Sequence, residues 1–439
     1  MQVKTDALPT LQGSAPLSSA LTQADVQPQL LSADASDPQV IGWMQGSPPV
    51  PEKVVRFSSI LQFPQTRWSF SHLRELLPSV QVARGKGAAS PLPRAERKDI
   101  DALVFTPLGS DRTMTWEQSL KANYTDGILV LHRGQVVYER YFGALTDQGQ
   151  HIAMSVTKSF IGTLGAMLVE EGSIDPQAKV SHYVLELKDS AFGDATLRQV
   201  MDMTVGVRYS EEYVDPKAEI WEYLRAAHMI PRPDGYAGAT TVTEYLMKLR
   251  KEGEHGQAFA YKTVNTEVLS WVIQRATGKS VAVNLQERIW SKLGAEQDAY
   301  LIVDEVGTAL AGGGFNTSLR DLARFGEMMR LDGTFNGQQI VPKRVIADIR
   351  GGASQQDFAK AGYELLPNWS YRDMWWVSHD THGVYSARGL NGQSVYIDPK
   401  AKIVIVRYAS HPLANSSNFD PTTLPAYRAV ANHLMANSL

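Results

Sequence analysis

The chain has 439 residues, with 43 Lys and Arg against 46 Asp and Glu, so its formal net charge is −3. A charge this close to zero excludes the basic excess typical of nucleic-acid-binding proteins, and a content of 43% hydrophobic and 20% charged residues excludes a disordered or fibrous protein. The absence of cysteine excludes disulfides, thiol catalysis and cysteine-ligated zinc.

Residues 1–62 are rich in Pro, Ser and Ala and show no clear period, which predicts an extended N-terminal arm. Residues 1–20 contain a single Lys and no apolar core, so we expect no secretory signal and a cytoplasmic location; a trimmed mature form would instead fit the periplasm. The sequence has no apolar run of the length that spans a membrane.

The main domain is predicted over residues 63–439, and its order becomes plain near residue 125. Residues 128–132 and 135–142 read as two strands joined across Arg133-Gly134. A helix is predicted over 155–171, with apolar residues at helical spacing and Gly172 at the position of a C-terminal cap.

The middle of the chain, residues 175–334, is predicted as an inserted all-helical lobe, with helices at 265–277 and from Ser318 onward. Strands return at 394–397 and 402–409, and a helix over 425–435 follows. The expected fold class is therefore α+β: an antiparallel sheet built from both chain ends (about 63–174 and 335–439), flanked by helices, with the helical lobe between.

One motif carries chemistry. Ser155 and Lys158 are three residues apart at the start of the predicted helix, so both side chains lie on one face of its first turn. A serine hydroxyl needs a base within hydrogen-bond reach, and a lysine can serve if burial lowers its pKa. The spacing alone is a weak signal, because Ser-x-x-Lys also arises by chance and a solvated helix start would look the same.

Tyr261, just before the helix at 265–277, is a candidate for relaying a proton, although an ordinary half-buried tyrosine would look the same. The segment 379–382, His-Asp-Thr-His, is interpreted as a polar loop because no third metal ligand is suitably spaced. We therefore expect no metal site.

Six blocks follow one another along the chain: 67–73 (RWSFSHL), 154–158 (MSVTK), 212–216 (EYVDP), 261–271 (YKTVNTEVLSW), 321–324 (DLAR) and 375–376 (WW). With Ser155, Lys158, Tyr261 and a glycine strand near the C-terminus, the chain resembles the serine β-lactamase and penicillin-binding-protein superfamily with its class C-like esterases. The order and spacing of the blocks resemble, more narrowly, the 6-aminohexanoate-dimer (nylon-oligomer) hydrolases. The resemblance covers about residues 63–410 and implies a β-lactamase/DD-peptidase-like fold.

The resemblance also implies roles for individual residues. Ser155 would be acylated, Lys158 would accept its proton, and Tyr261 would pass a proton to the leaving group. The backbone N–H groups of Ser155 and Leu390 would form the oxyanion hole. Tyr213 would contact the substrate amide and Trp376 would wall the pocket.

The chain departs from the family pattern at three places. The third motif reads Ala387-Arg388-Gly389 where lactamases carry a Lys or His, and strand alternation predicts that Arg388 cannot take that role. Thr263 stands where the second motif expects Asn. The acidic residue that holds a substrate ammonium is matched by Leu224, with Glu222 nearby as the candidate.

The sequence therefore predicts a serine hydrolase of small linear amides, of the 6-aminohexanoate-oligomer type, that works without a cofactor. The alternative is a carboxylesterase for short acyl esters with the same Ser-Lys-Tyr site. A binding or sensor protein that acylates and then stalls is a third hypothesis, and a true lactamase is disfavoured by Ala387. The expected partner is a small-molecule substrate, with no nucleic acid or membrane span; the sequence leaves a homodimer open.

Overall fold

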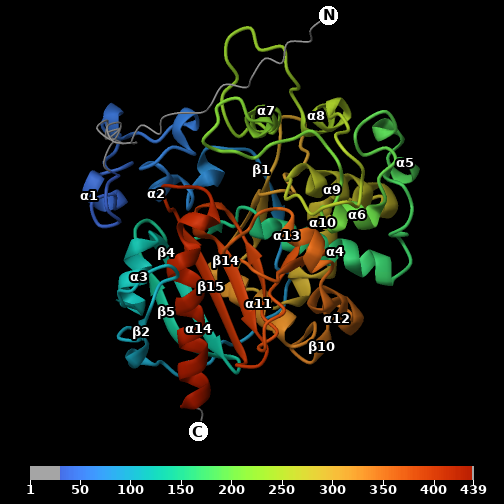
Figure 1. Cartoon of the computed structure of the whole chain (residues 1–439). Coiled ribbons are helices and arrows are strands. Elements are labelled where there is room, and N and C mark those ends of the chain that lie inside the picture. Colours follow the sequence, from blue (N-terminus) through green and yellow to red (C-terminus); the bar gives the residue numbers. More distant parts are fainter. Residues whose placement is uncertain (1–29, 438–439) are drawn as a thin grey trace, which may run out of the picture.

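A seven-stranded antiparallel sheet forms the centre of the computed structural model, which describes residues 30–437 (Figure 1). Its strands lie in the order β11 (Ser370–Arg372), β12 (Trp375–Val377), β13 (Tyr385–Arg388), β14 (Ser394–Asp398), β15 (Ile403–Ala409), β4 (Thr125–His132) and β5 (Gln135–Tyr141). Because β15 pairs with β4, the C-terminal strands continue a sheet that the N-terminal half began. The prediction of one sheet from both chain ends is confirmed, as are both predicted hairpins.

Helices cover both faces of this sheet. On β4, Ile128 and Val130 point toward α14 (Asp420–Ala436) and α3 (Trp116–Ala122), which pack together on one face. The alternate residues Leu129 and Leu131 join the main core, on the face where α11 (Leu319–Arg330) packs against β4, β14 and β15. All four side chains are fully buried, so the strand reads as a continuous apolar run.

The last helix begins at Asp420, five residues before the predicted start at 425, and runs through Pro425. A proline inside a helix leaves the carbonyl four residues earlier without its intrahelical donor. Here that carbonyl, of Pro421, accepts a hydrogen bond from the N–H of Leu108 at 2.9 Å. The helix therefore continues because a tertiary contact satisfies the group that the proline leaves unpaired.

A second antiparallel sheet has the order β1 (Ser79–Val82), β7 (Ala299–Ile302), β8 (Phe315–Thr317) and β6 (His151–Ile152). Its strands β7 and β8 lie inside the region predicted as an all-helical lobe, so that region is not all-helical. Two short pairs, β2 (Val104–Phe105) with β3 (Met114–Thr115) and β9 (Thr334–Phe335) with β10 (Gln338–Gln339), complete the strands of the described residues.

The remaining α-helices of the described chain are mostly short. They are α1 (Pro38–Ile41), α2 (Thr66–Ser69), α4 (Val156–Glu170), α5 (Val180–Tyr183), α6 (Leu197–Met201), α7 (Glu219–Ala226), α8 (Val242–Lys248), α9 (Val264–Thr277), α10 (Val281–Arg288), α12 (Lys343–Gly351) and α13 (Gln355–Ala359). The predicted helices at 155–171 and 265–277 are confirmed as α4 and α9, and α11 begins after Ser318, whose side chain caps it.

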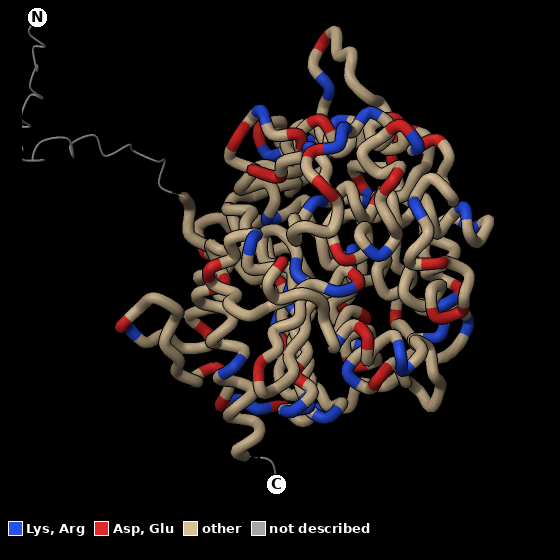
Figure 2. Tube along the Cα trace, turned by 45° about the vertical axis from the view of Figure 1, so that its right-hand side comes forward, with Lys and Arg blue, Asp and Glu red and all other residues tan. Residues whose placement is uncertain are grey.

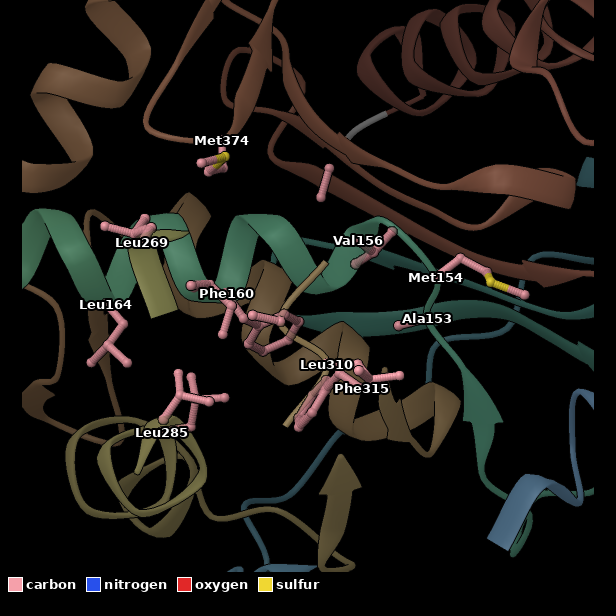
Figure 3. Close-up of a cluster of buried hydrophobic side chains, with 14 of the residues drawn as sticks. Ala153, Met154, Val156, Phe160, Leu164, Leu269, Leu285, Leu310, Phe315 and Met374 are labelled. Carbon is pink, nitrogen blue, oxygen red and sulfur yellow. The ribbon is translucent and has the colours of Figure 1, made fainter. Parts of the chain in front are cut away.

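Helix α4 passes through the middle of the main core, and its residues from Val156 to Leu168 are all buried (Figure 3). The ring of Phe160 lies 4.7 Å from that of Phe315 on β8, centroid to centroid. The loop before β12 packs directly on the helix, because a side chain at Gly162 would place its Cβ 2.1 Å from the carbonyl oxygen of Asp373. The start of α4 is thereby held from several sides.

Residues 30–62, predicted as part of an extended arm, contain short helical turns and pack on the body: Ile60 is buried, and the hydroxyl of Tyr124 donates to the carbonyl of Leu31 at 2.7 Å. The rest of the predicted arm, residues 1–29, lies outside the described residues. Charged residues of both signs are interspersed along the described chain (Figure 2). None of its helices is both long and apolar enough to cross a bilayer. The division into lobes stays a prediction.

Candidate active site

The hydroxyl of Ser155 stands at the N-terminus of α4, directly after the short strand β6. The preceding residue, Met154, has a φ of 46°, in the left-handed region that non-glycine residues seldom adopt. The backbone is fixed there by the N–H of Ala153, which donates to the carbonyl of Phe315 at 2.8 Å. This sharp turn between strand and helix leaves Ser155 half-buried at the wall of two hollows.

Lys158 lies one helical turn further on, with 1% of its surface exposed. Its Nζ donates to Ser155 Oγ at 2.8 Å and to the carbonyl of Gly312 at 2.6 Å. Burial lowers the pKa of Lys158 to about 8, and the carboxylates of Glu211 and Glu267 oppose this shift. An amine with this pKa is about one-tenth neutral at pH 7, against about one in three thousand for an ordinary lysine.

Tyr261 completes the group from the loop before α9. Burial raises its pKa well above the ordinary value, and hydrogen bonding with Ser155 acts in the opposite direction. Its ring lies 5.3 Å from that of Trp376, and Lys158 Nζ lies 5.1 Å from the centre of its ring. The structure thus brings Ser155, Lys158 and Tyr261 together, as the sequence predicts.

The end of β13 touches the backbone of the serine. A Cβ at Gly389 would lie 2.9 Å from the carbonyl oxygen of Ala153 and 3.0 Å from the backbone nitrogen of Ser155. Only glycine allows this approach without movement of the backbone. Leu390, the next residue, lines both hollows beside Ser155.

Two carboxylates that the sequence analysis missed support the site. Glu267 is buried and accepts three hydrogen bonds, from the hydroxyl of Tyr223 at 2.6 Å and from the N–H groups of Ala311 and Gly312 at 3.1 and 2.7 Å. It therefore holds the residue, Gly312, whose carbonyl accepts from Lys158. Burial raises its pKa. No motif marks this role, because it depends on a loop 45 residues away in the chain.

The second is Glu211, half-buried beside the serine. It accepts a hydrogen bond from the N–H of Thr263, and burial raises its pKa while the charge of Lys158 lowers it. Its place directly before the block at 212–216 was the only signal in the sequence that could have singled it out.

Two hollows meet at Ser155. The first, here called the apolar hollow, has a volume of about 520 Å³ and is walled by Phe57, Ile60, Phe70, Ile220, Trp221, Leu224, Met229, Leu310 and Leu413, among others. The second, the polar hollow, has a volume of about 630 Å³ and is lined by Tyr261, Trp376, Glu211, Glu212, Glu364, Arg388 and Asp420, among others. Ser155, Tyr213 and Leu390 line both.

The structure places Glu222 differently from the prediction. Glu222 lines neither hollow; it pairs with Arg225 at 2.6 Å and accepts from the hydroxyl of Tyr236 at 2.8 Å. Residues two apart lie on opposite sides of a helix, so α7 turns Ile220 and Leu224 inward and Glu222 outward. Glu222 is therefore not placed to hold a substrate ammonium.

Arg388 was expected to be unable to take the place of the missing cation. Its side chain does line the polar hollow, with its guanidinium carbon 5.2 Å from the ring of Trp376. Both carboxylate oxygens of Asp420 accept from it, so its charge is already compensated. Strand alternation did not foresee this, because β13 ends at Arg388 and α14 supplies the partner.

The segment 379–382 behaves as a polar loop. His382 Nδ1 contacts a carboxylate oxygen of Asp398 at 2.7 Å, and His379 Nε2 contacts the hydroxyl of Ser370 at 2.7 Å. Across residues 30–437 no group of three or more acidic or histidine side chains is arranged to hold a metal ion.

The sequence of the chain is similar to those of known hydrolases. Residues 117–426 match the protein family described as Beta-lactamase. The 6-aminohexanoate-dimer hydrolase of Paenarthrobacter ureafaciens is 36% identical over 350 residues, which are 80% of this chain and 86% of that protein.

The fold is also similar to those of solved structures. A protein from Bacillus anthracis, provisionally assigned as a 6-aminohexanoate-dimer hydrolase, is 33% identical and superposes with a TM-score of 0.80 over 88% of this chain and 98% of its own. A family VIII carboxylesterase, 16% identical, has a TM-score of 0.53 over 78% of this chain and 99% of its own, and so shares the fold.

Proposed function

Because the chain belongs to the Beta-lactamase family and is a hydrolase of the serine class, we propose that Ser155 is the nucleophile of a two-step hydrolysis of small linear amides. The observation that carries this proposal is the 2.8 Å contact between Ser155 Oγ and the Nζ of a buried lysine whose pKa is lowered to about 8. The 6-aminohexanoate-dimer hydrolase named above supplies the model substrate.

In the first step neutral Lys158 accepts the proton of Ser155, and Oγ attacks the amide carbonyl carbon. The negative charge that develops on the carbonyl oxygen is held by the backbone N–H groups of Ser155 and Leu390, which the close approach of Gly389 sets side by side. Lys158 fits the role of base because burial disfavours its charged form.

Tyr261 fits the role of acid, because its raised pKa keeps its hydroxyl protonated. It gives its proton to the amide nitrogen, the C–N bond breaks, and the amine leaves. Lys158 then passes the proton that it took from Ser155 to Tyr261, and the acyl group stays on Ser155. In the second step water attacks the acyl carbon, the proton transfers run in reverse, and the acid is released.

Tyr213 and Trp376 are proposed as substrate contacts. Tyr213 stands where the two hollows meet, within reach of an amide bound at Ser155. Trp376, with 6% of its surface exposed, forms a wall of the polar hollow behind Tyr261. Glu222 is not proposed for this role.

The test is the rate of amine release from the linear 6-aminohexanoate dimer, measured beside the hydrolysis of p-nitrophenyl butyrate. The Ser155→Ala variant is the blank and should lose turnover by a factor of about 10⁴ or more, with an unchanged circular dichroism spectrum. Undiminished activity in that variant would refute the proposal. Ester cleavage without any amide cleavage would favour the carboxylesterase alternative. The apolar lining of the first hollow, which suits a short acyl chain, is the observation that favours this alternative.

The same assay distinguishes an enzyme from the third hypothesis, a binding or sensor protein. A protein that binds and stalls would show a stable mass adduct on Ser155 and no steady turnover. The oligomeric state stays open between a single chain and a homodimer. The molar mass in solution, measured by light scattering, decides it, and the mass of a single chain, 48.5 kDa, would exclude the homodimer.

A further inference from the structure

We propose that the acyl half of the substrate is an uncharged aliphatic chain that occupies the apolar hollow, while the amine half leaves through the polar hollow. This inference rests on the proposed function and names the substrate class of the same site. It is drawn from the different chemistry of the two hollows on either side of Ser155.

The position of Tyr261 decides which half of the substrate lies on which side. Tyr261 lines the polar hollow and is not part of the wall of the apolar hollow. The leaving nitrogen must contact the hydroxyl that protonates it, so the amine half lies on the Tyr261 side. The acyl half stays bonded to Ser155 and extends in the other direction, into the apolar hollow.

Every residue that lines the apolar hollow, within the part of the chain that the structure describes, is uncharged at neutral pH. Most of the walls are aliphatic and aromatic side chains. They include residues of segment 57–62 near the N-terminus, of 220–231 around α7, of the loop before β8 and of 412–414, together with Phe70, Met154, Tyr213, Val214 and Leu390. The polar side chains among the lining residues carry neutral hydroxyl, amide or indole groups, such as those of Ser58, Gln62 and Trp221.

Two carboxylates that contact or adjoin residues of this wall already have partners of their own. Both oxygens of Glu267, behind the wall, accept hydrogen bonds from Tyr223, Ala311 and Gly312. Glu222 points out of α7 and pairs with Arg225. Neither is free to receive the ammonium of an amino-terminated acyl chain.

An ammonium that enters such a hollow loses its hydration and gains no counter-ion, which disfavours it strongly. A methyl end in the same place gains from the burial of apolar surface, and each added methylene should raise the rate constant kcat/KM about threefold to fourfold until the hollow is filled. The hollow therefore selects against the charge and for the length of the acyl chain.

The experiment compares two amides that release the same amine. One is the linear 6-aminohexanoate dimer, and the other is N-hexanoyl-6-aminohexanoate, in which the terminal ammonium is replaced by hydrogen. Amine release by the wild-type protein, with Ser155→Ala as blank, should give a kcat/KM at least tenfold higher for the hexanoyl compound. An equal or higher value for the dimer would overturn the inference and leave the proposed function standing.

If neither amide is cleaved, the proposed amide hydrolysis is refuted. The inference about the acyl half is then tested by the hydrolysis rates of esters. p-Nitrophenyl hexanoate should then exceed p-nitrophenyl 6-aminohexanoate by the same factor, and the p-nitrophenyl acyl series from two to ten carbons should show the rise with chain length. A flat series, or a preference for the amino ester, would overturn the inference.

A variant pair tests the location of the acyl chain. Leu224 is half-buried on α7 and lines the hollow. Leu224→Asp should lower the ratio of hexanoyl to aminohexanoyl kcat/KM at least tenfold, because it supplies the missing counter-ion. Leu224→Asn has nearly the same shape without the charge and should change the ratio by less than threefold. A ratio that does not move in Leu224→Asp, with a native thermal midpoint, would contradict this placement.

Discussion

The Nζ of Lys158 lies 2.8 Å from Ser155 Oγ and 2.6 Å from the carbonyl oxygen of Gly312, so one buried amine joins the nucleophile to the loop before β8. The N–H of the same residue, Gly312, donates to Glu267, which ties that loop to α9. The orientation of the lysine is therefore fixed by elements that the chain brings from three different regions.

The pH dependence follows from this lysine. A base must be neutral to accept a proton, and the pKa of Lys158 is lowered to about 8. Below pH 8 most of the enzyme carries the charged amine, so kcat/KM should rise with pH and level off above about pH 8. Initial rates between pH 6 and 10 check this. A profile already flat at pH 6 would contradict the role of Lys158 as base.

The Glu211→Gln substitution should move that profile. The carboxylate of Glu211 raises the pKa of Lys158, so its removal lowers the pKa further and shifts the rising limb to lower pH. The amide oxygen can still accept from the N–H of Thr263. Glu212→Gln, at the exposed neighbouring residue, is the matched control and should leave the limb in place. A limb that stays unmoved in both variants would refute the electrostatic coupling.

The Gly389→Ala substitution should lower kcat by a factor of about 10 to 100, because the new Cβ meets backbone atoms of Ala153 and Ser155 and displaces the oxyanion donors. KM should change less, since Gly389 is one of many residues in the wall of the polar hollow and the other lining side chains are unchanged. Gly351→Ala, where a Cβ meets nothing within 4 Å, is the control. Full activity in Gly389→Ala would show that this contact does not position the site.

The Gly162→Ala substitution addresses stability. Its Cβ would lie 2.1 Å from the carbonyl oxygen of Asp373, a backbone atom that cannot yield without moving the loop before β12. We expect a loss of about 1–3 kcal/mol in the free energy of unfolding, as for other overpacked cores. Urea unfolding measures it, with the open position Gly87→Ala as control. Equal midpoints for the two variants would contradict the tight contact.

Removal of residues 1–50 should leave acylation of Ser155 intact, because the hollows at the serine are lined from residue 57 onward. The measurement is the mass adduct formed with a fluorophosphonate. A shorter chain that begins after residue 62 lacks Phe57 and Ile60 and should lose the preference for longer acyl chains. Loss of the adduct in the first truncation would contradict the prediction.

The sequence by itself determined the elements with strong local signals. The strands of both hairpins, helices α4 and α9 and the cap at Ser318 follow from periodicity and from the backbone preferences of single residues. The spacing of Ser155 and Lys158 fixed their shared helix face, because three residues span nearly one turn.

Only the tertiary structure decided what surrounds that pair. The lowered pKa of Lys158, the contact of Gly389 with the serine backbone and the clamp of Glu267 on Gly312 all join residues from distant parts of the chain. The direction of Glu222 and Arg388 also depends on partners outside their own elements. Local pattern cannot encode such contacts, because burial, desolvation and pairing arise only when separate segments pack together.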